Sequence, residues 1–138
     1  MKVFVLINTY DETIDGTYTL EGKREKEQEF LVSAIKAKEA HIDEMRTALL
    51  GLKERFDFIN FQAKKLAECC VFPRATRDPN YDKNCGRYEE LHEERTKIAE
   101  QVSKLTLRIS QVTAFSTADI MKHYSVGYRW EECELQGN

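Results

Sequence analysis

Residues 31–70, LVSAIKAKEAHIDEMRTALLGLKERFDFINFQAKKLAECC, contain the pattern that decides the fold of this chain. Apolar side chains recur along this segment in steps that alternate between four and three residues. The stripe positions are Leu31, Ile35, Lys38, Ile42, Met45, Leu49, Leu52, Phe56, Ile59, Ala63, Leu66 and Cys70, and only Lys38 departs from apolar character. A mean spacing of about 3.5 residues keeps one narrow stripe on the same side of a helix, as a coiled coil requires. We therefore expect one long coiled-coil helix that begins after Gly22.

A second stripe with the same spacing follows Gly86. Its positions are Tyr88, Leu91, Arg95, Ile98, Val102, Leu105, Ile109, Val112 and Ser116. The intervening residues 72–86 contain both prolines of the chain and predict a loop. Two single-stripe helices joined by such a loop can bury each other's stripes as an antiparallel hairpin. If Cys70 lies opposite Tyr88, facing residues have numbers that sum to about 157, because both helices rise equally per residue.

The first part of the chain predicts a β-hairpin. Residues 3–7 are apolar and β-prone, a polar segment with Gly16 follows, and residues 17–20 alternate between polar and apolar side chains. Two strands joined by a turn fit this order.

The last part predicts a short helix and a further strand. Ser116-Thr117-Ala118-Asp119 has the form of a capping box, so a helix is expected over residues 117–123. Residues 124–135 then predict a strand with Tyr124, Val126, Tyr128 and Trp130 on one face. We expect this strand to join the hairpin in a sheet that covers residues 24–41 of the long helix.

The predicted fold class is therefore α+β. It combines a long antiparallel coiled-coil helical hairpin with a small three-stranded antiparallel sheet that the N- and C-terminal segments form. We expect residues 1–138 to be a single domain: residues 1–22 plus 115–138 form a β head, and residues 23–114 form a helical hairpin stalk with its loop at 72–86.

Composition limits the possible partners. The 138 residues include 24 acidic and 21 basic side chains, with a formal net charge of −3. This balance disfavours a general nucleic-acid binder, which needs excess Lys and Arg to neutralise phosphates. The longest apolar run, residues 3–7, is far shorter than the ~20 residues of a membrane helix or the ~7–15 residues of a signal core. We therefore expect a cytoplasmic protein with no membrane contact.

No residue pattern indicates catalysis. The six glycines form neither G-x-G-x-x-G nor G-x-x-x-x-G-K, and the three histidines form no H-E-x-x-H motif. Cys69, Cys70, Cys85 and His92 have the spacing C-C-x14-C-x6-H, which lacks the close C-x2-C pairs typical of structural zinc sites. Metal binding by these four residues stays open, but we expect neither metal nor cofactor and predict that the protein is not an enzyme.

Two phenylalanines are expected to point outward. Phe58 and Phe61 are each displaced by two positions, or about 200°, from the stripe residues Phe56 and Ile59. Burying such side chains contributes about 1.5–3 kcal/mol each, so we expect either Phe72 and the loop or another chain to cover them. We expect a homodimer first and a different partner protein second.

The expected tip of the hairpin is basic. The cations there are Arg74, Arg77, Lys83 and Arg87, with Tyr81 among them. Such a cluster could contact a phosphate backbone, as some RNA-binding helical arms do, although we favour a plain polar loop as its explanation. Nucleic-acid binding is therefore the alternative function.

The two ends of the chain resemble a family of proteins. KVFVLINTYDETIDGTYTLEGKREKEQEFL, residues 2–31, and YRWEECEL, residues 128–135, are similar to small phage-encoded accessory proteins with a ββαβ head. The resemblance covers none of the helical hairpin and carries no catalytic motif. It implies an origin in a bacteriophage or mobile element, where such proteins often bind and block a host or defence factor.

The function expected from the sequence is that of a non-enzymatic interaction protein. With the resemblance, this becomes a phage-encoded inhibitor that binds a host or bacterial-immunity protein through its coiled coil, in the cytoplasm of the host cell. The candidate partner-binding residues are Phe58, Phe61, Arg74, Arg77, Tyr81, Lys83 and Arg87.

Overall fold

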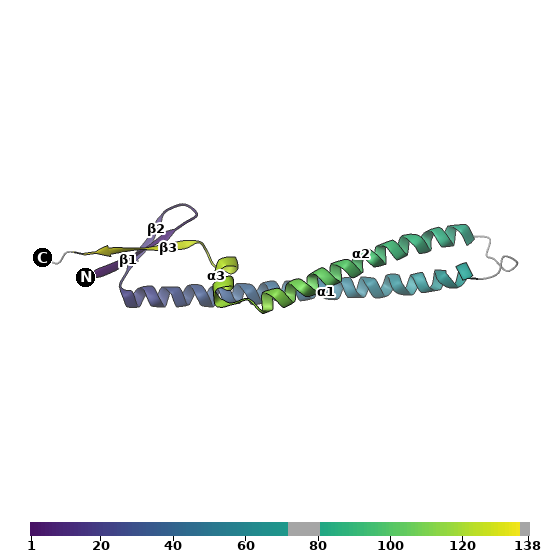
Figure 1. The fold of residues 1–138 in the computed structure, drawn as a ribbon, viewed down its shortest axis with the longest axis horizontal. Coiled ribbons are helices and arrows are strands. Elements are labelled where there is room, and N and C mark those ends of the chain that lie inside the picture. Colours follow the sequence, from purple (N-terminus) through teal and green to yellow (C-terminus); the bar gives the residue numbers. More distant parts are fainter. Residues whose placement is uncertain (72–80, 136–138) are drawn as a thin grey trace. The chain divides into compact units, whose positions relative to one another are not determined.

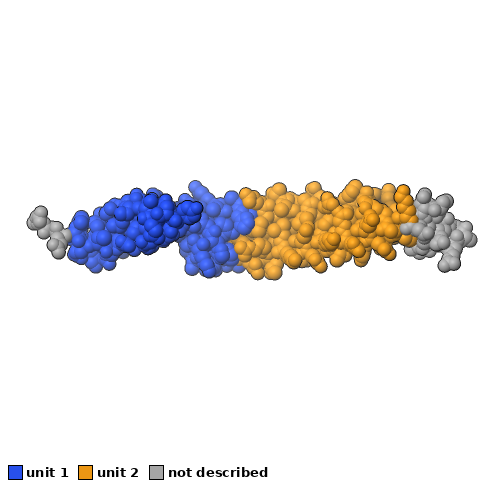
Figure 2. Space-filling view, turned by 90° about the horizontal axis from the view of Figure 1, so that it is seen from above, with its two compact units in different colours: residues 1–41, 114–138 blue, residues 42–113 orange. Residues whose placement is uncertain are grey.

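The structure, a computed structural model, describes residues 1–71 and 81–135, with the side chains of 69–71 and 81–82 left undescribed. The elements in chain order are β1 (Lys2–Asn8), β2 (Ile14–Tyr18), α1 (Leu20–Val71), α2 (Tyr81–Thr113), α3 (Thr117–Tyr124) and β3 (Tyr128–Glu134) (Figure 1). The fold is α+β, as predicted, with two long helices packed together and a three-stranded antiparallel sheet. The chain divides into two compact units: unit 1 comprises residues 1–41 and 114–138, and unit 2 comprises residues 42–113 (Figure 2).

The sheet of unit 1 has the strand order β2-β1-β3, so the first strand lies in the centre. Both pairings are antiparallel, and Leu6 lies opposite Gly16 on one side and Trp130 on the other. Because directly opposite residues point to the same face, Leu6 and Trp130 share a face with Phe4 and Tyr18, which also pair with each other. The Leu6 side chain is only 1% exposed and lies at the centre of this face.

The same face of the sheet packs on the first turns of α1. Phe30 of α1 stacks on Tyr128 of β3, with ring centroids 4.4 Å apart. The ammonium group of Lys23 lies 4.8 Å from the Phe4 ring centroid and 5.8 Å from that of Trp130. These contacts confirm the expectation that the sheet covers the first part of the long helix.

The long helix begins earlier than predicted. The sequence placed its start after Gly22, whereas α1 starts at Leu20. Thr19 explains the difference, because its hydroxyl oxygen accepts a hydrogen bond from the Gly22 amide (3.1 Å) and its carbonyl accepts one from the Lys23 amide (2.8 Å). A threonine that caps a helix satisfies amides that otherwise lack partners, and this outweighs the low helix propensity of one glycine.

The short helix after α2 was predicted correctly, but the beginning of the last strand was not. Ser116 caps α3 and accepts a hydrogen bond from the Asp119 amide at 3.2 Å. Tyr124 ends this helix, and β3 begins only at Tyr128, so the predicted strand over residues 124–135 is wrong in its first four residues. Val126 is exposed rather than part of the sheet face.

Unit 2 is a pair of helices that bury their stripes. Its core combines side chains from both helices, namely Ile59, Ala63, Leu91 and Ile98, with Leu52, Phe56, Leu66, Tyr88 and Val102 packed against them. All of these are predicted stripe positions. The last predicted position, Ser116, is exposed, because it caps α3 instead.

Polar residues also join the two helices across their contact. Arg95, half-buried within the second stripe, donates to Oδ1 of Asn60 on α1 at 2.8 Å, and Arg55 of α1 forms an ion pair with Glu94 of α2. The numbers of Asn60 and Arg95 sum to 155, close to the expected value. A buried stem with a hydrogen-bonded head is how a coiled-coil seam accommodates an arginine.

The second long helix also begins earlier than predicted. The sequence placed residues 81–86 in the loop, whereas α2 starts at Tyr81 and contains Gly86. One glycine costs a helix only about 1 kcal/mol relative to alanine, so it did not mark the end of the loop. Among the described residues, neither long helix nor α3 is apolar over enough of its length to cross a membrane.

Candidate functional site

Three large exposed apolar side chains of unit 2 lie on α1, and a fourth, Leu107, lies on α2. Phe58 is 61% exposed, Phe61 is 57% exposed and Leu50 is 62% exposed. Successive residues of a helix are about 100° apart, so Phe58, Phe61 and Leu50 fall on the side of α1 that faces away from the buried Ile59 and Ala63. The predicted outward orientation of both phenylalanines is therefore confirmed.

Charged residues flank the two phenylalanines on the same face. Glu54 precedes Phe58 by four residues, and Lys65 follows Phe61 by four residues. The ammonium group of Lys65 lies over the Phe61 ring, 4.6 Å from its centroid, which is a cation–π contact. The arrangement places two aromatic rings between an acidic and a basic side chain, with all four side chains exposed to solvent.

This face continues in both directions with coiled-coil spacing. Its positions are Gly51, Glu54, Phe58, Phe61, Lys65 and Glu68, in steps that alternate between three and four residues. All six are exposed, in contrast to the buried stripe on the other side of α1. We call these six residues the outer stripe.

The predicted basic tip is only partly described. Arg74 and Arg77 lie outside the described residues, and Tyr81 is the first residue of α2 with no side chain described. Lys83 is exposed, and Arg87 is exposed but forms an ion pair with Glu90 at 3.1 Å. Of the two described cations, one is thus paired with a carboxylate on its own helix.

Of the four candidate metal ligands, only Cys85 and His92 have described side chains. Residues 1–71 and 81–135 contain no group of three or more His, Cys, Asp or Glu residues able to hold a metal ion. The side chains of Cys69 and Cys70 fall outside the description. His92 stacks on Tyr88, with centroids 6.3 Å apart, and its Nδ1 lies 2.7 Å from Nη2 of Arg95.

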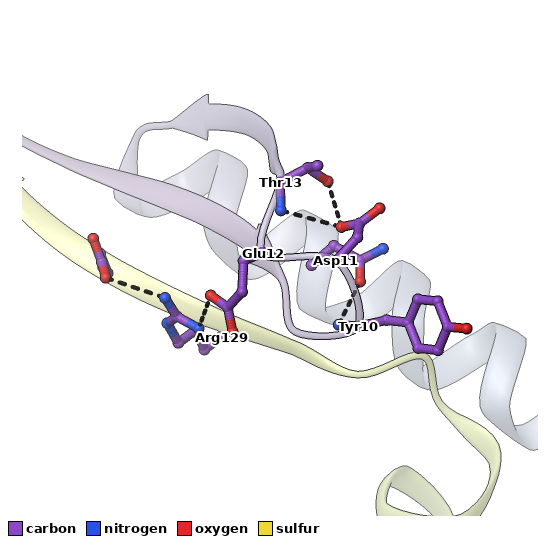
Figure 3. A network of polar contacts seen from close by, with 7 residues as sticks. Tyr10, Asp11, Glu12, Thr13 and Arg129 are labelled. Carbon is purple, nitrogen blue, oxygen red and sulfur yellow. Dashed lines mark hydrogen bonds and ion pairs between the residues drawn. The ribbon is translucent and has the colours of Figure 1, made fainter.

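The turn expected between β1 and β2 is held by hydrogen bonds that were not predicted from the sequence. Asp11 Oδ1 accepts hydrogen bonds from the Thr13 hydroxyl (2.6 Å) and the Thr13 amide (3.1 Å) (Figure 3). The hydroxyl bond and then the amide bond stabilise the ionised carboxylate and hold the pKa of Asp11 below its usual value of 3.8. Glu12 adopts a left-handed backbone with φ of 59°. The asparagine and aspartate of NTYDET are the sequence signal, because both favour such turns.

Contacts to β3 fasten this turn. Nη1 of Arg129 lies 2.6 Å from a carboxylate oxygen of Glu12, and its Nη2 lies 3.6 Å from Glu131 (Figure 3). The hydrogen bond that the Arg129 guanidinium donates to Glu12 raises the pKa of this guanidinium. Tyr10 is 96% exposed, and its ring points away from the network (Figure 3). The turn is therefore attached to β3 by an ion pair, and its one aromatic side chain, Tyr10, is exposed to solvent.

Comparisons with models of protein families, with curated proteins and with solved structures found no match to this chain. The outer stripe is the surface with two aromatic side chains and charges of both signs on a single helix face.

Proposed function

We propose that the protein is a non-enzymatic interaction protein that binds another protein chain through the outer stripe of α1. The observation that carries this proposal is the position of Phe58 and Phe61, one turn apart and each more than half exposed on the face opposite the core of unit 2. Leu50 extends the apolar surface along the same face.

The energetics favour a protein partner for this face. Burying a phenylalanine side chain contributes about 1.5–3 kcal/mol, and aromatic side chains are frequent at the centres of protein interfaces. Glu54 and Lys65 supply charged groups at the rim of the two rings, where they can select the orientation of a partner. An apolar centre with a charged rim is the usual composition of a protein-binding surface.

The resemblance of the chain's two ends to phage accessory proteins extends this proposal to a biological role. Under that extension, the protein acts in the cytoplasm of a bacterial host and inhibits a host or bacterial-immunity protein by occupying its surface. Its described residues offer a binding face, and the resemblance supplies the class of target.

Binding of nucleic acid through the basic tip has less support. Arg87 already pairs with Glu90, and the next residues of α2 include the exposed carboxylates Glu89 and Glu93. A helix start with balanced charge attracts phosphates less than an unpaired basic cluster does. A salt titration of RNA and DNA binding with Lys83→Ala and Arg87→Ala variants separates this alternative from the proposal.

Affinity capture tests the proposed function. Tagged wild-type protein is mixed with untagged protein and a bacterial lysate, and every captured chain is identified, including the untagged copy. We expect a Phe58→Asp, Phe61→Asp variant to lose a specific partner that the wild type captures. Leu107→Asp is the matched control, because Leu107 of α2 is exposed to the same extent. Identical capture by wild type and double variant would refute the proposal.

A further inference from the structure

We propose that the partner of the outer stripe is a second copy of this chain, with the two α1 helices antiparallel and Phe58 of one copy against Phe61 of the other. This inference rests on the proposed function, because it names the occupant of the same face. It is argued from residues of α1 within unit 2 alone.

The outer stripe extends over several turns of α1. Its steps alternate between three and four residues from Gly51 to Glu68. This repeat holds a side-chain stripe against a second helix over its whole length, which at about 1.5 Å per residue is roughly 26 Å here. A helix can therefore lie along this face, and a second copy of α1 presents the same positions.

The charges of the outer stripe are complementary when two copies lie antiparallel. When Phe58 of one copy lies opposite Phe61 of the other, residues whose numbers sum to 119 face each other. Glu54 then faces Lys65, and twofold symmetry forms this pair on both sides of the aromatic centre. At the ends, Gly51 faces Glu68, and the glycine leaves space there because a Cβ atom would meet nothing within 4 Å.

The same charges exclude a parallel arrangement. In a parallel, in-register pair each residue meets its own counterpart, so Glu54 would face Glu54 and Lys65 would face Lys65. Like charges that face each other across an interface are destabilising, whereas the antiparallel register converts both contacts into attractive ones. Charge therefore selects one of the two orientations that the apolar centre alone would allow.

The contact is modest in size, so the dimer should depend on concentration. Stable interfaces bury about 1,200–2,000 Å² in total, and an aromatic side chain contributes about 150–250 Å² when fully buried. Four phenylalanine rings, already partly covered in each copy, provide the centre of such an interface but not a large one. We expect a reversible equilibrium between monomer and dimer.

Charge reversal tests the register. In Glu54→Lys, and separately in Lys65→Glu, both Glu54–Lys65 pairs become like-charged, and we expect the dissociation constant to rise about tenfold. Combining the two substitutions in one chain restores both pairs and should restore the wild-type constant. Mixing the two single variants should also restore association, because the two different chains are complementary. Both residues are exposed, so folding should persist, which far-ultraviolet circular dichroism checks.

Sedimentation equilibrium over a range of protein concentrations measures these constants. The inference is overturned if the wild type stays monomeric, if single reversals leave the constant unchanged, or if neither the double variant nor the mixture recovers association. A monomeric wild type that still captures a different protein through Phe58 and Phe61 would refute the second copy as partner and leave the proposed function standing. If the wild type neither self-associates nor captures another protein, both the inference and the proposed function are refuted.

Discussion

The hydroxyl group of Tyr124, the last residue of α3, lies 2.7 Å from Nδ1 of His41 on α1. Both side chains are partly buried, and their rings are tilted by 54° with centroids 5.7 Å apart. This hydrogen bond joins the short helix to the long one within unit 1. It also accounts for the position of Tyr124, which ends a helix rather than starting a strand.

Replacing Tyr124 with Phe should remove this hydrogen bond and keep most of the ring packing. We expect a loss of about 0.5–1.5 kcal/mol in the free energy of unfolding, the usual net contribution of such a bond. Urea unfolding followed by the fluorescence of Trp130, the single tryptophan, reports on unit 1. Tyr10→Phe is the matched control. Tyr10 is 96% exposed, so removing its hydroxyl group should leave the free energy of unfolding unchanged. Equal effects of both changes would contradict the assignment.

Replacing Leu6 with Ala should destabilise unit 1 strongly. Leu6 is 1% exposed at the centre of the sheet, and removing such a side chain leaves a cavity that costs about 2–5 kcal/mol. Urea unfolding followed by Trp130 fluorescence measures the change in the free energy of unfolding. Leu135→Ala, at a half-exposed leucine, should stay within about 0.5 kcal/mol of wild type. A similar small effect at Leu6 would show that the sheet face is not packed as described.

Replacing Ala63 with Leu should destabilise unit 2. Ala63 is fully buried in the core between α1 and α2, so added methyl groups must displace neighbours at a cost of about 1–3 kcal/mol. Thermal unfolding followed by far-ultraviolet circular dichroism gives the change in stability. Ala48→Leu, at an exposed alanine of the same helix, is the control and should leave stability nearly unchanged. An unaffected or stabilised Ala63→Leu protein would argue against close packing at this position.

The Asp11 turn should respond to acid. Because its folded pKa is below 3.8, the ionised carboxylate contributes stability above that pH, and the contribution is lost as pH falls through the lower folded value. Carboxyl-detected NMR titration should give a pKa below 3.8 for Asp11. Thr13→Val removes the hydroxyl donor and should raise that pKa towards the usual value. An unchanged titration in the variant would mean that Thr13 does not cause the shift.

The sequence was sufficient to predict the helical pair because its signal is long and regular. Ile59, Ala63, Leu91 and Ile98 all occupy predicted stripe positions, and burial of a repeated stripe dominates over local exceptions. The capping box at Ser116 was also readable, since it is a local hydrogen-bonding pattern. The outward direction of Phe58 and Phe61 followed from helix geometry alone.

The parts that could not be predicted depend on single side chains or on contacts between distant residues. Thr19 shifts the start of α1 through two hydrogen bonds, and Gly86 is carried inside α2 at a small cost. Tyr124 is held in α3 by His41, which lies 83 residues away in sequence. The Arg129–Glu12 ion pair likewise needs the fold before it can be recognised.

The order of strands β2-β1-β3 has a consequence for how the chain is made. While the ribosome is still producing α2, the nascent β1 can pair with β2 but has no neighbour on its other edge, because residues 128–134 do not yet exist. An unpaired edge of a largely apolar strand can capture other nascent chains. Slower synthesis of residues 114–138, or their removal by a premature stop codon, should therefore promote aggregation.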